Sequence, residues 1–146
     1  MKLVKEHILF GVLDQDQTIN ILQTTRSNVG YRIVDFQCMP NAPGDNTASP
    51  DTGKSVLLTT VPPTALNEFV YDQNTTLGIA TFCAGSQANM IDSGTLIVNE
   101  LYVTNMARSA GIVNGRTSYQ VVLEQYDISS DEQVIAIIRE NSQAIE

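Results

Sequence analysis

Three segments in the second half of the chain carry β-branched and aromatic residues in strand-like runs, and each is bounded by Gly, Asn, Asp or Ser. They are TLGIATFCAG (76–85), GTLIVNELYVTN (94–105) and RTSYQVVLEQYDI (116–128). Val, Ile, Thr, Tyr and Phe pack well on a pleated surface, and the bounding residues favour turns. This pattern is therefore typical of short antiparallel strands, and we expect a mainly β domain.

The length and charge of the chain limit its fold and its partners. With 146 residues, the chain fits a single domain that buries roughly two-thirds of the surface its unfolded form would expose. Eight basic residues against 16 acidic ones give a net charge of −8. This charge disfavours nucleic acid and acidic membrane surfaces, because binding to phosphates needs clustered Lys and Arg. A basic patch on another protein would be attracted.

The start of the chain is expected to be a strand and not a targeting segment. Glu6 and His7 interrupt its apolar stretch, and no small-residue cleavage site follows as it would in a secretory signal. No apolar run approaches the roughly 18 to 20 residues that span a bilayer. We expect a first strand at residues 3–13 and a second at 19–25 that could pair with it as a hairpin. We also expect the chain to be made and kept in a cytosol.

Residues 31–39 (YRIVDFQCM) are expected to form a strand that is covered on both sides. Strict alternation would place Ile33 and Met39 on one face and Phe36 and Cys38 on the other, so that apolar side chains fall on both. The segment 40–53 that follows is rich in Pro, Gly, Asn, Asp, Ser and Thr and lacks large apolar side chains. It predicts a long loop, and we expect this loop to act as a contact arm.

Proline, asparagine and glycine punctuate the rest of the β region. Pro62-Pro63 should end a strand at 54–61, because proline cannot donate to the ladder. In residues 96–103 both alternating sets contain apolar side chains, which indicates a bulge or a turn at Asn99-Glu100. The dipeptide Asn114-Gly115 predicts a type I′ hairpin between AGIV and the strand after it. Short strands are also expected at 67–74 and 76–85, with a turn at 72–75 and a loop at 85–94.

The C-terminal segment has the start signals of a helix. Ser130 and Gln133, with two acidic residues between them, have the form of a capping box: the serine hydroxyl accepts a backbone N–H bond and the glutamine side chain reaches back. An apolar stripe would then follow the helix, formed by Val134, Ile137, Ile138 and Ile145. The alternative is a last strand, since QVIAIIR is rich in β-branched residues, but the cap favours the helix.

The two cysteines and the single histidine point to structural roles. Cys38 and Cys83 are too far apart for a CxxC redox or zinc motif and lie in apolar strand contexts. We expect two buried free thiols, with a disulfide as the alternative if their strands are adjacent. His7 lies among aliphatic residues, and we expect it to be structural or on the surface. No GxSxG, HExxH or Walker phosphate loop occurs, so the sequence assigns no catalytic, cofactor-binding or metal-ligating residue.

Acidic residues form weak patterns only. Asp14, Asp16 and Thr18 space their oxygens like the start of a calcium loop, but Ile19 and Thr25 stand where an EF-hand needs Gly and a bidentate acid. A solvated turn is the better interpretation. Weaker candidates are calcium binding by Asp45 and Asp51, a carboxylate pair at Glu68 and Asp72, and the glycosylation pattern Asn74-Thr75-Thr76.

Tyrosines could stack on sugar rings in a carbohydrate-binding module. The five are Tyr31, Tyr71, Tyr102, Tyr119 and Tyr126. Four of them lie inside expected strands, where core or cross-strand packing is the commoner role. The chain has no Trp, which further weakens the carbohydrate interpretation.

Three segments together resemble parts of small virion structural proteins of tailed marine bacteriophages. They are YRIVDFQCMPNAPGD, TLIVNELYVTN and SYQVVLEQYDISSDEQVIAIIRENSQ. In that family a strand ending in FQxMP precedes a polar loop, a central LIVxxLYV strand comes next, and a final strand and helix end the chain. The resemblance covers about two-thirds of the sequence, and its motifs are structural.

The resemblance implies an antiparallel β-sandwich, jelly-roll-like, with a short C-terminal helix, which decorates or cements a capsid. It implies a homo-oligomer, usually a trimer at quasi-threefold positions, bound to the major capsid protein on the virion surface, with no catalytic residues. We expect contacts from the 40–53 loop, the first strand and the C-terminal helix. The alternative is a ligand-binding β-sandwich, such as a carbohydrate-binding or receptor-binding part of a tail or fibre.

Overall fold

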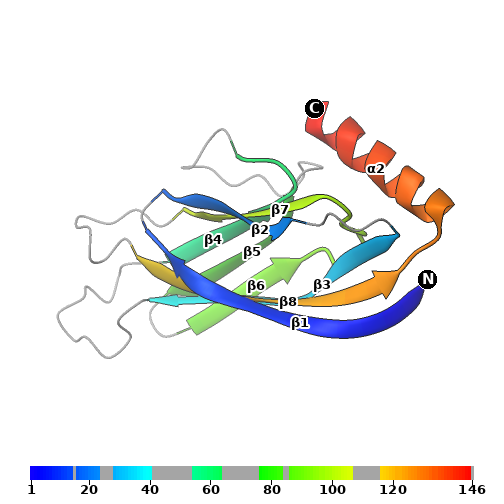
Figure 1. Cartoon of the computed structure of the whole chain (residues 1–146). Coiled ribbons are helices and arrows are strands. Elements are labelled where there is room, and N and C mark those ends of the chain that lie inside the picture. Colours follow the sequence, from blue (N-terminus) through cyan, green and yellow to red (C-terminus); the bar gives the residue numbers. More distant parts are fainter. Residues whose placement is uncertain are drawn as a thin grey trace.

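The computed structural model describes residues 1–14, 16–23, 28–40, 54–63, 76–83, 86–106 and 116–145. For Gln23, Pro40, Cys83 and residues 139–145 it describes the backbone only. The described residues form eight strands and one C-terminal helix. The strands make two antiparallel sheets that pack face to face as a β-sandwich (Figure 1). The expected mainly β fold is therefore confirmed.

The smaller sheet has the order β1-β8-β3. Its strands are β1 (Lys2–Leu13), β8 (Thr117–Asp127) and β3 (Val29–Pro40). Successive side chains of a strand point to opposite faces, and β8 alternates accordingly between buried and more exposed positions. Its buried residues are Thr117, Tyr119, Val121, Leu123 and Gln125. The side chains between them form the outer face of this sheet.

The larger sheet has the order β2-β7-β4-β5-β6. Its strands are β2 (Thr18–Gln23), β7 (Glu100–Asn105), β4 (Lys54–Thr59), β5 (Thr76–Cys83) and β6 (Ser86–Ile91). The core lies between the two sheets, and its fully buried large side chains come from both. They include Leu13, Ile33, Phe36, Leu58, Leu77, Ile97, Leu101 and Leu123.

The strand connectivity is jelly-roll-like, as expected. In a jelly roll, a long antiparallel ribbon is rolled up so that the first strand pairs with the eighth, the second with the seventh, the third with the sixth and the fourth with the fifth. The pairs β1–β8, β2–β7 and β4–β5 are present here. β6 pairs with β5 instead of β3, but the side chain of Asn89 on β6 still donates to the Phe36 carbonyl of β3 at 2.7 Å.

The predicted hairpin between the first two strands is wrong. β1 pairs with β8 and β2 pairs with β7, so the chain crosses from one sheet to the other between Leu13 and Thr18. Leu13 and Leu22 are both buried and approach the same core from opposite sheets. A local hairpin would have left β1 and β2 in the same sheet. Placing them in opposite sheets instead buries apolar side chains of both strands in the core between the sheets.

The predicted two-sided burial of residues 31–39 is also wrong. The pairing of β3 with β8 shifts between Ile33 and Asp35, so Val34 is the extra residue of a β-bulge. The extra residue shifts the alternation of side chains by one position, so that Ile33, Phe36 and Cys38 are all buried in the core. Ile33, Phe36 and Cys38, which seemed to lie on both faces, therefore serve one face, whereas Met39 is exposed on the other.

The strands at 3–13, 54–61 and 76–85 are confirmed as β1, β4 and β5, whereas the loop predicted at 85–94 is wrong because β6 occupies most of it. β6 is an edge strand whose first five side chains are exposed, so its polar sequence lacks alternation. The expected interruption at Asn99 is present: Ile97 pairs with Tyr31 in an isolated bridge, and β7 begins only afterwards.

Four expected elements lie outside the described residues. They are the 67–74 strand, the 72–75 turn, the 40–53 loop beyond Pro40, and the Asn114-Gly115 turn. The strand after that turn, β8, has β1 along one edge and β3 along the other.

The predicted C-terminal helix is confirmed as α2 (Ser130–Ile145), but its cap is one residue earlier than expected. The Ser129 hydroxyl accepts the Glu132 amide at 3.1 Å, and the Glu132 carboxylate accepts the Ser129 amide at 3.3 Å. This reciprocal pair is a capping box. The bonds from Ser129 hold the pKa of Glu132 below its usual value. Gln133, the predicted partner, instead accepts the Asn28 amide at 3.0 Å.

The predicted apolar stripe of α2 is buried only in part, and the side chain of its last member, Ile145, lies outside the described residues. Ala136 is buried and Ile137 half-buried against Val98 and Ile128, in a small cluster separate from the main core. Val134 and Ile138, which the stripe should have buried, are exposed, as is Ile135. The helix projects from one end of the sandwich (Figure 1).

Replacing Ser129 tests which serine caps the helix. S129A should lower the free energy of unfolding by about 1 kcal/mol, because it removes an N-cap side chain. S130A should have a smaller effect, since the Ser130 hydroxyl makes only a 3.4 Å contact with the Asn28 side chain. Urea denaturation followed by circular dichroism would measure both. A larger loss for S130A than for S129A would contradict the observed cap.

Candidate binding surface

His7 has a structural environment, as the sequence indicates. Its Nε2 atom lies 2.6 Å from the side-chain oxygen of Gln125. Its ring meets Tyr31 edge to face, with centroids 6.0 Å apart. Within the described part of the chain, no carboxylate is hydrogen-bonded to this histidine, so no acid–histidine pair is formed there.

The acidic residues of the first turn are separated by the fold. Asp14 pairs with Arg116 at 3.1 Å on the surface, Asp16 occupies a turn with a φ of 60°, and the Thr18 hydroxyl lies 2.9 Å from that of Thr104. Among the described residues, no group of three or more His, Cys, Asp or Glu side chains could hold a metal ion. Asp45, Asp51, Glu68, Asp72, Asn74 and Thr75 lie outside the described residues.

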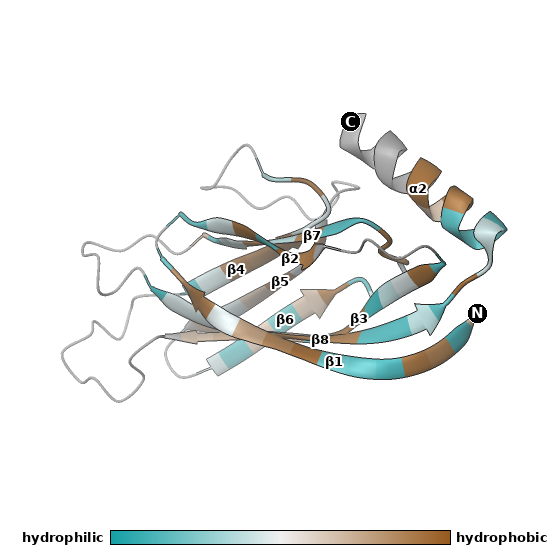
Figure 2. Ribbon diagram, in the orientation of Figure 1, coloured by the Kyte–Doolittle hydropathy of each residue, from teal (hydrophilic) through white to brown (hydrophobic). Residues whose placement is uncertain are grey.

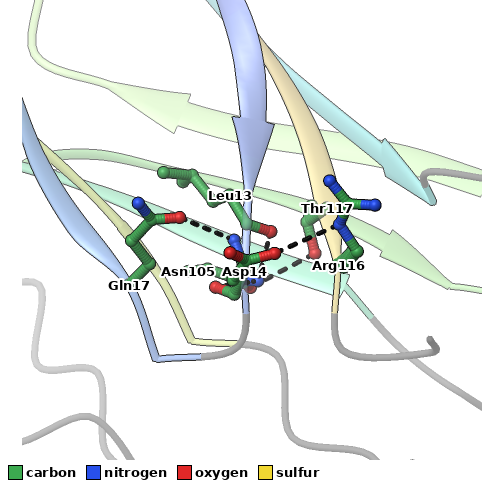
Figure 3. A network of polar contacts seen from close by, with 6 residues as sticks. All are labelled: Leu13, Asp14, Gln17, Asn105, Arg116 and Thr117. Carbon is green, nitrogen blue, oxygen red and sulfur yellow. Dashed lines mark hydrogen bonds and ion pairs between the residues drawn. The ribbon is translucent and has the colours of Figure 1, made fainter. Parts of the chain in front are cut away.

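A buried asparagine ties the ends of four strands together at this turn (Figure 3). Asn105, fully buried at the end of β7, donates to the backbone oxygens of Leu13 and Asp14 at 3.3 and 3.0 Å. The Thr117 hydroxyl donates to its side-chain oxygen at 3.2 Å. The backbone N–H of Asn105 also donates to the carbonyl of Gln17, just before β2. This network is structural, because it fixes the place where the chain passes between the sheets.

The Cys38 thiol is free and buried in the core, so the alternative of a disulfide with Cys83 is wrong. The thiol donates to the Ala80 carbonyl at 3.3 Å. Burial raises the pKa of this thiol to about 12. Since the thiolate is the reactive form, Cys38 is inert in the folded protein. The side chain of Cys83 lies outside the described residues.

Alkylation should report this inertness. Iodoacetamide at neutral pH is expected to modify Cys38 much more slowly in the folded protein than in denaturant, because both burial and the raised pKa must be overcome. Mass spectrometry of the peptide that contains Cys38 would measure the rate, with the same protein in urea as the control. Equal rates in the two states would contradict a buried thiol.

The described tyrosines lie on different faces of the sandwich and do not gather into one stacking platform: Tyr119 is on the core-facing side of β8, whereas Tyr126 and Tyr102 are on the outward-facing sides of β8 and β7. Tyr119 is buried. The hydroxyls of Tyr102 and Tyr126 donate to Glu100 and Glu124 at 2.8 and 2.7 Å, and these carboxylates raise the pKa of both tyrosines. The Tyr126 ring also lies 5.5 Å from the Arg32 guanidinium carbon. Tyr71 is outside the described residues.

The most unusual surface is the outer face of the smaller sheet. Residues paired across an antiparallel ladder share a face, so the register of β1 and β3 with β8 defines its members. Apart from Leu3 near the start of β1, its apolar members are Ile8, Phe10, Val12, Met39 and Val122, which we name the apolar face. Ile8 is 52% and Phe10 78% exposed. Figure 2 shows hydrophobic residues distributed along β1.

The sequence contained a signal for the apolar face. In HILFGVL, apolar residues occupy both alternating sets of β1: Leu9 and Leu13 point inward, whereas Ile8, Phe10 and Val12 point outward. A strand with only one face in a core should be polar on the other. Exposed apolar patches of this kind mark surfaces that bind other molecules.

Comparisons with known proteins add no relative from which a role could be transferred. No protein-family model, curated protein or solved structure matches the chain.

Within the residues that the structure describes, no helix has the length and apolar character that crossing a bilayer requires.

Proposed function

We propose that this chain is a bacteriophage virion structural protein, a decoration or cement subunit that binds the major capsid protein. The observation that carries the proposal is the apolar face, whose residue Phe10 is 78% exposed on an otherwise well-packed sandwich. A jelly-roll-like sandwich is an architecture found in viral capsid proteins, and the sequence resembles small virion proteins of tailed phages. Fold alone does not determine function, so the exposed face is the specific support.

The mechanism is binding by mass action. A subunit that binds only the assembled, expanded shell stabilises that shell by its binding free energy, which is about 2.7 kcal/mol at a free concentration 100 times the Kd. The apolar face supplies the hydrophobic contact. The net charge of −8 favours docking next to basic surfaces of the shell and keeps the chain away from the packaged DNA. The chain is made in the host cytoplasm and ends on the capsid surface.

Particle binding tests the proposal. The purified chain is mixed with capsids that lack it and sedimented, and mass spectrometry of purified virions establishes whether the native protein is present. Wild type should sediment with capsids. F10K should lose most of this binding, because it places a charge in the centre of the apolar face.

The matched control is M90K, which adds the same charge at an exposed methionine of β6 on the other sheet. It should bind like wild type. Absence of the chain from virions would exclude the proposed role, as would F10K binding as well as M90K. A glycan array with the same proteins would detect the alternative carbohydrate-binding role.

A further inference from the structure

β1 is a long edge strand with little protection against pairing. The order β1-β8-β3 places β8 on one side of it, and no described strand pairs with the other edge of its 12 residues. Natural edge strands usually avoid intermolecular pairing through lysines, prolines, bulges or a covering loop. In β1 the lysines and the bulge are all near the start, at Lys2, Lys5 and Val4. Among the described residues, the stretch 7–13 has none of these devices, and the apolar face borders it.

We propose that β1 pairs antiparallel with β1 of a second copy of this chain, about a two-fold axis at Leu9. The pairing would join two three-stranded sheets into one continuous sheet. A shift of one residue would set the outward side chains of one copy opposite the inward side chains of the other. Only every second register is therefore compatible with a continuous sheet that has one outer face. The register with Leu9 on the axis sets Ile8 opposite Phe10 of the second copy, and symmetry makes this contact twice. Aromatic and β-branched residues form favourable cross-strand pairs.

The charges at the two ends of β1 favour a second copy in the antiparallel direction. The start of β1 carries Lys2 and Lys5 against one acid, Glu6, whereas Asp16 and Asp14, the latter paired with Arg116, lie just beyond its end. Antiparallel pairing brings the basic end of each copy next to the acidic end of the other. A parallel arrangement would place like charges together. The strand is therefore complementary in charge to itself.

The pairing changes the form of the apolar face. Ile8 and Phe10 of one copy would lie opposite Phe10 and Ile8 of the second, and Val12 opposite Glu6, so the apolar faces of the two copies become continuous. The result is a two-fold dimer, in place of the trimer that the resemblance implies. This dimer is a property of the isolated chain and does not depend on the proposed capsid role.

Charge reversal at the contact tests the pairing. In the proposed register, I8K/F10K sets lysines opposite lysines, so this variant should associate at least about tenfold more weakly than wild type. I8E/F10E should be weakened in the same way. An equimolar mixture of the two variants should recover a 1:1 heterodimer, because each new lysine then faces a glutamate. Sedimentation equilibrium over a concentration series measures each mass.

The control is A88K/M90K, which adds two lysines at exposed positions of β6, an edge strand of the other sheet, and should remain a dimer. Ile8 and Phe10 are exposed, so folding should persist, and circular dichroism checks this for each variant. A second measurement is independent of charge: I8C mixed with F10C should form an intermolecular disulfide, whereas neither variant should do so alone.

Several results would overturn the pairing. These are a monomeric or trimeric wild type, a variant mixture that stays monomeric, or cross-linking of I8C with itself. A wild-type dimer that fails to bind capsids would contradict the proposed function alone, and a wild-type monomer that binds capsids would contradict the pairing alone.

Discussion

F36A is expected to lower the free energy of unfolding by about 3–5 kcal/mol, a large share of the stability of a single domain. Phe36 is fully buried and is brought into the core by the bulge at Val34. Removing its ring loses the transfer free energy of the buried atoms and leaves a cavity that the two sheets can fill only in part. Urea denaturation at high dilution, where the chain is monomeric, would measure the change.

The same substitution at Phe10 is the matched control. Phe10 is 78% exposed on the outer face, so F10A should change the free energy of unfolding of the monomer by no more than about 0.5 kcal/mol. Equal losses for F36A and F10A would contradict the assignment of inner and outer faces. They would also undermine the apolar face on which the proposed function depends.

N105A should have the next largest effect, a loss of about 1–3 kcal/mol in the free energy of unfolding. The truncation leaves the carbonyls of Leu13 and Asp14 and the Thr117 hydroxyl without the side chain that they bond. Asn105 is fully buried, so water cannot replace these bonds without entering the core. Leaving a buried polar group unsatisfied costs more than the net value of the bond itself.

A double-mutant cycle would separate the network from simple truncation. T117V removes the hydroxyl that donates to Asn105. The losses from N105A and T117V should therefore not be additive. Q120A, at an exposed position of β8, is the control for removing an amide at the surface. A loss for N105A no greater than that for Q120A would contradict a structural role for the network.

The sequence predicts those parts of this fold that depend on local signals. β8 alternates cleanly because one of its faces is in the core and it has a neighbour along each edge. The strand before Pro62-Pro63 was predicted, although β4 ends at Thr59, two residues before the expected end at Val61. The helix was also predictable, but both Ser129 and Ser130 have a suitable side chain three residues later. The backbone conformation at the first helical turn decides between them, and composition does not reveal it.

The parts that the sequence did not predict depend on contacts distant in the chain. The pairing of β1 with β8 joins residues more than 100 positions apart, and a local hairpin was the simpler expectation. β6 was missed because an edge strand with exposed side chains needs no alternation. The apolar face was visible as Ile8, Phe10 and Val12, but its exposure became clear only once Leu9 and Leu13 were known to face the core.

The contact between Asn89 and Phe36 has a consequence for the dynamics of the sandwich. Among the described strands, β6 is bonded through its backbone to β5 alone, and a side-chain amide replaces a ladder to β3. The two layers can thus separate here without breaking any main-chain pairing between them. Transient opening should begin where β6 meets β3. Protection of backbone amides from hydrogen exchange should therefore be lower along β6 than along the central strand β8.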